Sequence, residues 1–150
     1  MTNTSLPEAE RVGPGSVSAT RTGTRTFEGR NMRDATVQIG PAEVPGHFTP
    51  GELLKIALAG CVAMSADSVI SRRLGDDFES VVWAHGTSDD EENLYFAIDK
   101  EMLLDLGALE EPDRKKLATI IGKAVERSCT VSRSVQGSIR LTKTVNGEPF

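Results

Sequence analysis

The chain has 150 residues, a formal net charge of -5 and a pI near 5.1. This acidic balance argues against a nucleic-acid-binding protein, because such proteins carry a basic stripe and the lysines and arginines here form no run. The length favours a single domain. A hydrophobic content of 38% with only 5% aromatic residues predicts a globular protein with an aliphatic core.

The first residues are polar, which predicts a flexible N-terminal arm over residues 1–15 and one domain over residues 16–150. The arm lacks the apolar core of a signal peptide. We expect no membrane span either, because Glu52, Lys55 and Asp67 interrupt the most apolar stretch. A cytoplasmic location follows as the default, and thiols are kept reduced in that compartment.

Short alternating segments predict six strands, three of them before a long apolar helix. They cover residues 16–22, 25–28, 35–39, 78–84, 94–99 and 135–142. The last segment has the clearest alternation. A second helical pattern begins near Pro112. The predicted order is therefore βββ-α-ββ-α-β, which is an α+β fold.

The first helix is predicted over residues 50–74. Thr49 is a good N-cap, Pro50 suits the first helical position, Glu52 completes a capping box, and Gly75 is a typical stop. Apolar residues surround the whole circumference, so the helix must be buried on all sides. One sheet covers only one flank, and we infer a homodimer in which a partner chain covers the rest. The alternative is that the second helix covers it within one chain.

The two cysteines lie on apolar helical patterns, Cys61 in the middle of the first helix and Cys129 near the end of the second. They are either small core residues or a redox couple. A redox couple needs a cation that lowers the pKa of one thiol, a path for substrate, and a second thiol to capture the oxidised first one. Cys129 could be that second thiol, and the residues alone leave both interpretations open.

Other cysteine chemistry has weaker support. The chain has no Cys-x-x-Cys motif, and only His47 and His85 could complete a metal site, so we expect no metal and no bound cofactor. A cysteine hydrolase would need a histidine base. His47 is close to Cys61 in sequence, but it lies in a loop rich in proline and glycine and is expected at the surface.

Glu52 has two interpretations. It either closes the capping box or serves as a carboxylate that orients an arginine beside the thiol. Glu52 and Cys61 are separated by about 13.5 Å along one helix and point to opposite sides of it. Glu52 could therefore serve the Cys61 of a partner chain, if two such helices pack antiparallel.

Two segments resemble motifs of a known family. Thr49-Pro-Gly-Glu-Leu-Leu-Lys-Ile-Ala-Leu-Ala-Gly-Cys61 is similar to the Pro-x-Glu-Leu-Leu-x-Ala-Ala-x-Gly-x-Cys helix of the OsmC/Ohr family, the osmotically induced and organic hydroperoxide resistance proteins. Ser128-Cys-Thr-Val-Ser-Arg-Ser134 resembles the second-cysteine motif of that family, often Cys-Pro-Val-x-Arg. The resemblance extends over residues 16–145. It implies an intertwined homodimer with two long central helices packed against antiparallel sheets.

The resemblance also implies a reaction, in which Cys61 is the peroxidatic and Cys129 the resolving cysteine. We predict a thiol peroxidase of oxidative-stress defence that reduces organic hydroperoxides at the subunit interface. An external dithiol, such as a dihydrolipoyl group, would regenerate it. The apolar surroundings of Cys61 favour an organic hydroperoxide, because burial of an alkyl tail is favourable. The alternative is a non-enzymatic dimer that binds a small molecule or senses redox state.

Members of the family hold the thiolate with an arginine from the first strand pair. Arg25 is the best match, with Arg21 and Arg30 as rivals. In the organic-hydroperoxide branch a glutamate directly follows the motif proline, but Gly51 occupies that position here and Glu52 comes next. This matches the OsmC-like branch. Arg25 and Glu52 therefore complete the set of candidate catalytic residues.

Overall fold

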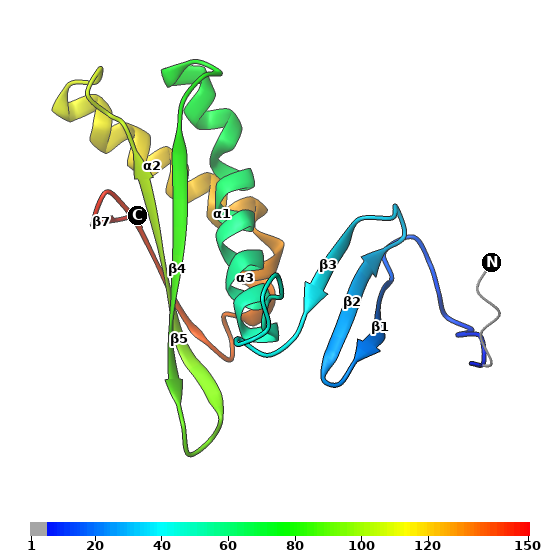
Figure 1. Ribbon diagram of the computed structural model, residues 1–150. Coiled ribbons are helices and arrows are strands. Elements are labelled where there is room, and N and C mark those ends of the chain that lie inside the picture. Colours follow the sequence, from blue (N-terminus) through cyan, green and yellow to red (C-terminus); the bar gives the residue numbers. More distant parts are fainter. Residues whose placement is uncertain (1–5) are drawn as a thin grey trace. The chain divides into compact units, whose positions relative to one another are not determined.

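The computed structural model describes residues 6–150, which form two compact parts (Figure 1). The first part ends at Glu52 and the second begins at Leu53. Residues 1–5 of the predicted arm lie outside the described residues, and residues 6–16 contain turns but no helix or strand. The predicted division into an arm and one domain stays a prediction.

The first part contains an antiparallel sheet of β1 (Val17–Gly23), β2 (Thr26–Asn31) and β3 (Thr36–Ile39), in that order. These strands confirm the three that the sequence predicts before the long helix. Arg25 lies in the turn between β1 and β2 with a φ of 58°. Gly29 lies opposite Val37, and a Cβ atom at Gly29 would approach that side chain to 2.8 Å, so β2 and β3 pack too closely there for a larger residue.

The long helix α1 (Pro50–Leu74) begins and ends as predicted. Its capping box is formed in both directions. The Thr49 backbone N–H donates to Glu52 Oε1 at 2.8 Å, and the Glu52 N–H donates to Thr49 Oγ1 at 3.1 Å. Gly75 follows the helix with a φ of 88°, a conformation that favours glycine, and its N–H bonds the Ser71 carbonyl.

Helix α1 is buried along one stripe rather than on all sides. The stripe repeats every four residues and consists of Leu58, Val62, Ala66 and Ile70. Met64 is 81% exposed and Ile56 is 49% exposed, so an apolar face remains uncovered in the single chain. By length and composition alone α1 could cross a membrane. Because its stripe contributes to the core, we interpret α1 as a core helix.

The second part is built on a four-stranded sheet in the order β4-β5-β6-β7. Its strands are β4 (Ser80–Asp89), β5 (Leu94–Leu104), β6 (Arg140–Val145) and β7 (Glu148–Pro149). Neighbouring strands run antiparallel except β5 and β6, which are parallel. The expectation of antiparallel sheets is therefore wrong for this one pair. The physical reason is that a helical crossover joins β5 to β6, and such a connection pairs strands in parallel.

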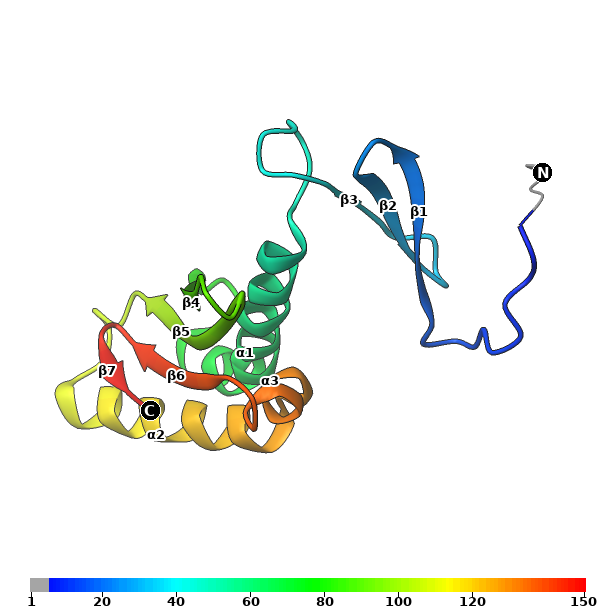
Figure 2. The same ribbon diagram turned by 90° about the horizontal axis from the view of Figure 1, so that it is seen from below.

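Two helices form that crossover, α2 (Glu111–Ser128) and the short α3 (Thr130–Val135). Helices α1 and α2 lie beside the sheet in both views (Figures 1 and 2). They meet the β5 side chains in one hydrophobic core. This core contains Val62, Ala66, Ile70, Met102, Leu104, Leu117, Ile121, Val125, Cys129 and Val145.

The strand expected over residues 135–142 is wrong in its first half. Val135 ends α3, and the strand begins only at Arg140. Val131, Val135 and Ile139 recur at helical spacing, and the Ile139 N–H donates to the Val135 carbonyl at 3.0 Å, so the backbone remains coiled to this point. The alternation of apolar and polar residues from 135 to 139 therefore does not mark a strand.

Asn146 and Gly147 form the turn between β6 and β7, with φ angles of 48° and 85° that match the turn of a tight hairpin. The Asn146 side chain accepts from the Leu104 N–H at 2.9 Å and donates to the Leu104 carbonyl at 3.0 Å. The chain end packs Phe150 against Gly122 of α2.

Candidate active site

The structure brings Cys61 and Cys129 together, as the redox interpretation requires. Both are free thiols at one hydrophobic core, and the side chain of each shifts the pKa of the other. Cys61 lies on α1 and is partly exposed, whereas Cys129 is 0% exposed. A small molecule can therefore reach Cys61 first, with Cys129 directly behind it.

The sequence predicts Cys129 within the second helix, near its end. In the structure it lies just outside, at the junction of α2 and α3. Its N–H donates to the Val125 carbonyl at 2.9 Å and so ends α2, while its carbonyl accepts from the Arg133 N–H at 3.1 Å and so begins α3. The backbone N–H groups of Val131 and Ser132 act to lower the pKa of Cys61, although burial outweighs them. The break between the helices thus supplies the second thiol and two backbone groups that favour the charged form of the first.

A buried lysine lies beside the thiols. Lys100 on β5 is 2% exposed, and its Nζ donates to Ser132 Oγ at 2.7 Å. Cys129 Sγ lies 2.9 Å from the same oxygen. Because the Ser132 hydroxyl accepts from Lys100, its own proton is available to a Cys129 thiolate. Lys100, Ser132 and Cys129 therefore form a chain from a cation to a sulfur.

These contacts shift the pKa values of the two thiols in opposite directions. Burial raises the pKa of Cys129, but hydrogen bonds from Cys61 and Ser132 and the charge of Lys100 outweigh it, so the net direction is down. Burial, followed by the contact with Cys129, raises the pKa of Cys61 above its usual value. Since the two thiols influence each other, they titrate as a pair, and the opposite pKa directions place the first negative charge mainly on Cys129.

Burial also lowers the pKa of Lys100, while the two cysteines act in the opposite direction. A lysine in the core is costly unless it has a partner, because burial disfavours its charge. The thiol pair and the Ser132 hydroxyl provide that partner. Lys100 is thus a cation close to the thiols that the sequence patterns did not indicate.

The sequence analysis missed Lys100 and Ser132. The strand predicted over residues 94–99 ends just before Lys100, whereas β5 continues to Leu104. A longer strand would have placed Lys100 between Ile98 and Met102 on the core face, and a lysine at such a position is itself a signal.

Two predicted site residues, Arg25 and Glu52, belong to the first part of the chain, and their role at Cys61 stays a prediction. Arg25 is exposed and lines a shallow pocket of its own part. Its rival Arg30 is engaged in ion pairs with Glu28 at 2.9 Å and Asp34 at 3.3 Å.

A substitution series separates the two interpretations of Glu52. Glu52→Gln should change the free energy of unfolding by less than about 0.5 kcal/mol, because glutamine also closes a capping box. Glu52→Ala should cost about 1 kcal/mol, since the Thr49 N–H loses its acceptor. Urea unfolding measures both. If Glu52→Gln slows thiol oxidation while stability is unchanged, Glu52 has a catalytic role beyond the cap.

The histidines lie apart from this chemistry. His47 Nδ1 is 2.9 Å from the Pro45 carbonyl in its loop, and His85 pairs with Glu101 at 3.4 Å. Among residues 6–150, no group of three or more histidine, cysteine, aspartate or glutamate side chains could hold a metal ion. The thiols therefore remain the centre of the candidate site.

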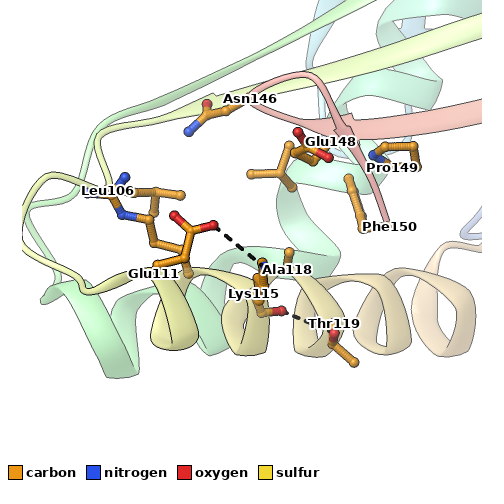
Figure 3. Close-up of a pocket in the computed structure, with 11 residues that line it drawn as sticks. Leu106, Glu111, Lys115, Ala118, Thr119, Asn146, Glu148, Pro149 and Phe150 are labelled. Atoms are coloured by element: carbon orange, nitrogen blue, oxygen red, sulfur yellow. Dashed lines mark hydrogen bonds and ion pairs between the residues drawn. The ribbon is translucent and has the colours of Figure 1, made fainter.

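One pocket of the second part is lined by neither thiol. It has a volume of about 650 Å³ and lies between α2 and the C-terminal strand, where Glu111 and Lys115 pair at 3.8 Å and Phe150 forms a wall (Figure 3). None of the predicted site residues lines it. We therefore place the candidate site at the cysteines, on the basis of their chemistry.

The fold and the site define an α+β protein with two neighbouring thiols, one on a long helix and one at a helix junction. The family model described as OsmC-like protein matches residues 40–143, which include both cysteines. The chain belongs to the OsmC-like family, and the resemblance stated from the motifs is confirmed.

Relatives at the sequence level come from mycobacteria. Proteins of Mycobacterium tuberculosis (strain ATCC 25618 / H37Rv) and Mycobacterium bovis, both described as uncharacterized, are 47% identical over 116 residues, which cover 77% of this chain and 85% of theirs. They support the family and carry no activity with them.

Solved structures confirm the fold class. The organic hydroperoxide resistance protein OhrB of Bacillus subtilis has a TM-score of 0.58 at 14% identity, over 87% of this chain and 96% of that one. An OsmC-like protein of unknown function from Vibrio cholerae has a TM-score of 0.69 at 12% identity, over 89% and 99%. At these identities the likeness shows the fold alone.

Proposed function

We propose that the protein is a two-cysteine thiol peroxidase that reduces organic hydroperoxides in oxidative-stress defence. The observation that carries this proposal is the neighbouring pair of reduced thiols beside a buried lysine. Two inert core cysteines would need no cation, because a neutral thiol packs as a small hydrophobe. The fold is also that of a Bacillus subtilis protein described as conferring organic hydroperoxide resistance.

The first step takes place at Cys61, because Cys129 has no exposed surface. Cys61 passes its proton to the neighbouring Cys129 thiolate and becomes the thiolate itself. The Cys61 sulfur then attacks the distal oxygen of the hydroperoxide, and the O–O bond breaks. The leaving alkoxide takes the proton from Cys129 and departs as the alcohol, which restores the Cys129 thiolate, while Cys61 becomes a sulfenic acid.

The second step closes a disulfide. The Cys129 thiolate, stabilised by Ser132 and Lys100, attacks the Cys61 sulfur, and the sulfenic oxygen leaves as water. In sum, one hydroperoxide and two thiols give one alcohol, one water and one disulfide. An external dithiol, such as a dihydrolipoyl group, restores both thiols by exchange and is itself oxidised to a disulfide.

The proposal includes a homodimer in the cytoplasm, where thiols are kept reduced. Proteins of the OsmC/Ohr family are typically homodimers. The uncovered side chains of α1, Ile56 and Met64, together with Val81, Trp83 and Leu103 on the sheet, form apolar surfaces that a second copy would cover. Coverage beside Cys61 would also create the apolar pocket that favours an organic hydroperoxide.

A thiol count tests the proposal. Reduced protein mixed with cumene hydroperoxide should lose two free thiols per chain, much faster than free cysteine does, and Cys61→Ser should abolish the rapid loss. The count is made with a chromogenic disulfide reagent after quenching. Loss at the rate of free cysteine would favour the alternative, a dimer that binds a small molecule or senses redox state without useful turnover.

A further inference from the structure

A further pocket includes Lys100 and Ser132 in its lining, but neither thiol. It has a volume of about 620 Å³ and is lined by residues of α2, α3, β5 and β6. Its charged lining consists of Lys100, Arg133, Arg140, Lys143 and a single acid, Glu126. Four cations against one acid give this pocket a positive balance in a chain whose net charge is -5.

These cations lack ion-pair partners within residues 6–150, where every ion pair found involves other side chains. Lys100 and Lys143 are also direct neighbours across the β5–β6 ladder. Like charges at directly opposed positions destabilise a sheet. Consistent with this repulsion, the Lys143 charge contributes to the lowered pKa of Lys100. An anion between them would relieve the strain.

The two guanidinium groups have free donors. Arg133 Nη1 makes one long hydrogen bond of 3.5 Å to the Arg127 carbonyl, and Arg140 is exposed at the start of β6. An arginine fork matches two oxygens of one carboxylate or phosphate. Lys143, whose Nζ lies 5.4 Å from the centre of the Phe150 ring, adds a third positive group.

We propose that this pocket binds a small molecule that bears two or more carboxylate or phosphate groups. Its volume suits a ligand of that size, and two arginines with two lysines supply charge for at least two anionic groups. The ligand would lie against Lys100 and Ser132, the residues that connect to Cys129. This site is distinct from the path to Cys61 and stands whether or not the chain reduces hydroperoxides.

Isothermal titration calorimetry on the reduced full-length chain tests the proposal, with pyrophosphate and citrate as probes and glycerol as the neutral comparison. One of the two anions should bind with one site per chain. Arg133→Gln and Arg140→Gln should each weaken that binding by about tenfold, the loss of one charge-assisted contact. Lys123→Gln removes the same charge from an exposed position of α2 outside the pocket and should change the affinity less than about twofold.

The comparison of probes identifies the chemistry. Tighter binding of pyrophosphate assigns a phosphate-bearing ligand, and tighter binding of citrate assigns a carboxylate. The proposal is overturned if neither anion binds at millimolar concentration, or if Lys123→Gln weakens binding as much as the pocket variants do. Circular dichroism of each variant verifies that it is folded. No hydroperoxide is used, so failure here is separate from failure of the peroxidase proposal.

Discussion

Replacement of Lys100 by methionine is expected to slow oxidation of the thiols by cumene hydroperoxide about tenfold at pH 7. The lysine charge helps to lower the pKa of Cys129. Its removal raises that pKa, so less of the pair is ionised at neutral pH and only the thiolate reacts. The rate should recover as the pH rises. Stopped-flow measurement of thiol loss between about pH 6 and pH 9 would show the profile displaced to higher pH.

The same variant should be at least as stable as the natural chain at neutral pH. Burial holds the pKa of Lys100 below its usual value, so the folded chain binds this proton less tightly than the unfolded chain does. The charge of Lys100 therefore lowers stability in full at pH values below the folded-state pKa, and stability rises with pH between the folded-state pKa and the higher unfolded-state pKa. Methionine removes the cost of burying the charge.

Two measurements complete the test of Lys100. Lys123→Met changes an exposed lysine of α2 and should alter neither the pH profile nor the stability. A Lys100→Met chain that is folded, yet oxidised with an unaltered pH profile, would show that the lysine balances charge in the core without acting on the thiols.

Local chemistry made the long helix predictable. Thr49 and Glu52 cap it through contacts three residues apart, and Gly75 ends it through its own backbone conformation. Such contacts join residues that are close in the sequence, so a short stretch of sequence is enough to predict them. The same holds for the turn at Asn146, whose positive φ suits asparagine.

Tertiary contacts explain what the sequence pattern could not show. Lys100 is buried because Ser132, 32 residues away, receives its hydrogen bond, and no local pattern encodes that partner. The parallel pairing of β5 and β6 likewise depends on where the crossover returns the chain. The alternation that suggested a strand from Val135 was overridden by the helical hydrogen bonds of the α3 region.

The two thiols of the candidate site were therefore predictable from the sequence, but the charged group beside them was not. The spacing and motifs placed Cys61 and Cys129 in one core, and the structure joins them. The family resemblance implies that an arginine of the first strand pair holds the thiolate. In the described part that holds both thiols, the neighbouring cation is Lys100, on a strand that the prediction had cut short.

Cys129→Ser is expected to abolish the intramolecular disulfide while Cys61 remains open to oxidation. The sulfenic acid formed at Cys61 would then lack the thiol that captures it, and excess cumene hydroperoxide would carry it to the sulfinic and sulfonic acids. Mass spectrometry of the intact chain should show successive single-oxygen additions in place of the loss of two hydrogens. The hydroxyl of the new serine can still bond Ser132, so the fold should persist.

Ser132→Ala is the matched control, because it keeps both thiols and removes only the hydroxyl that connects Cys129 to Lys100. It should still form the disulfide, although more slowly, and should not accumulate sulfinic acid at low peroxide. If Cys129→Ser instead survives repeated cycles of hydroperoxide and dithiothreitol as well as the natural chain does, a thiol from the reductant captures the sulfenic acid directly. Cys129 would then have no resolving role, and its contact with Lys100 would serve only to adjust the charge beside Cys61.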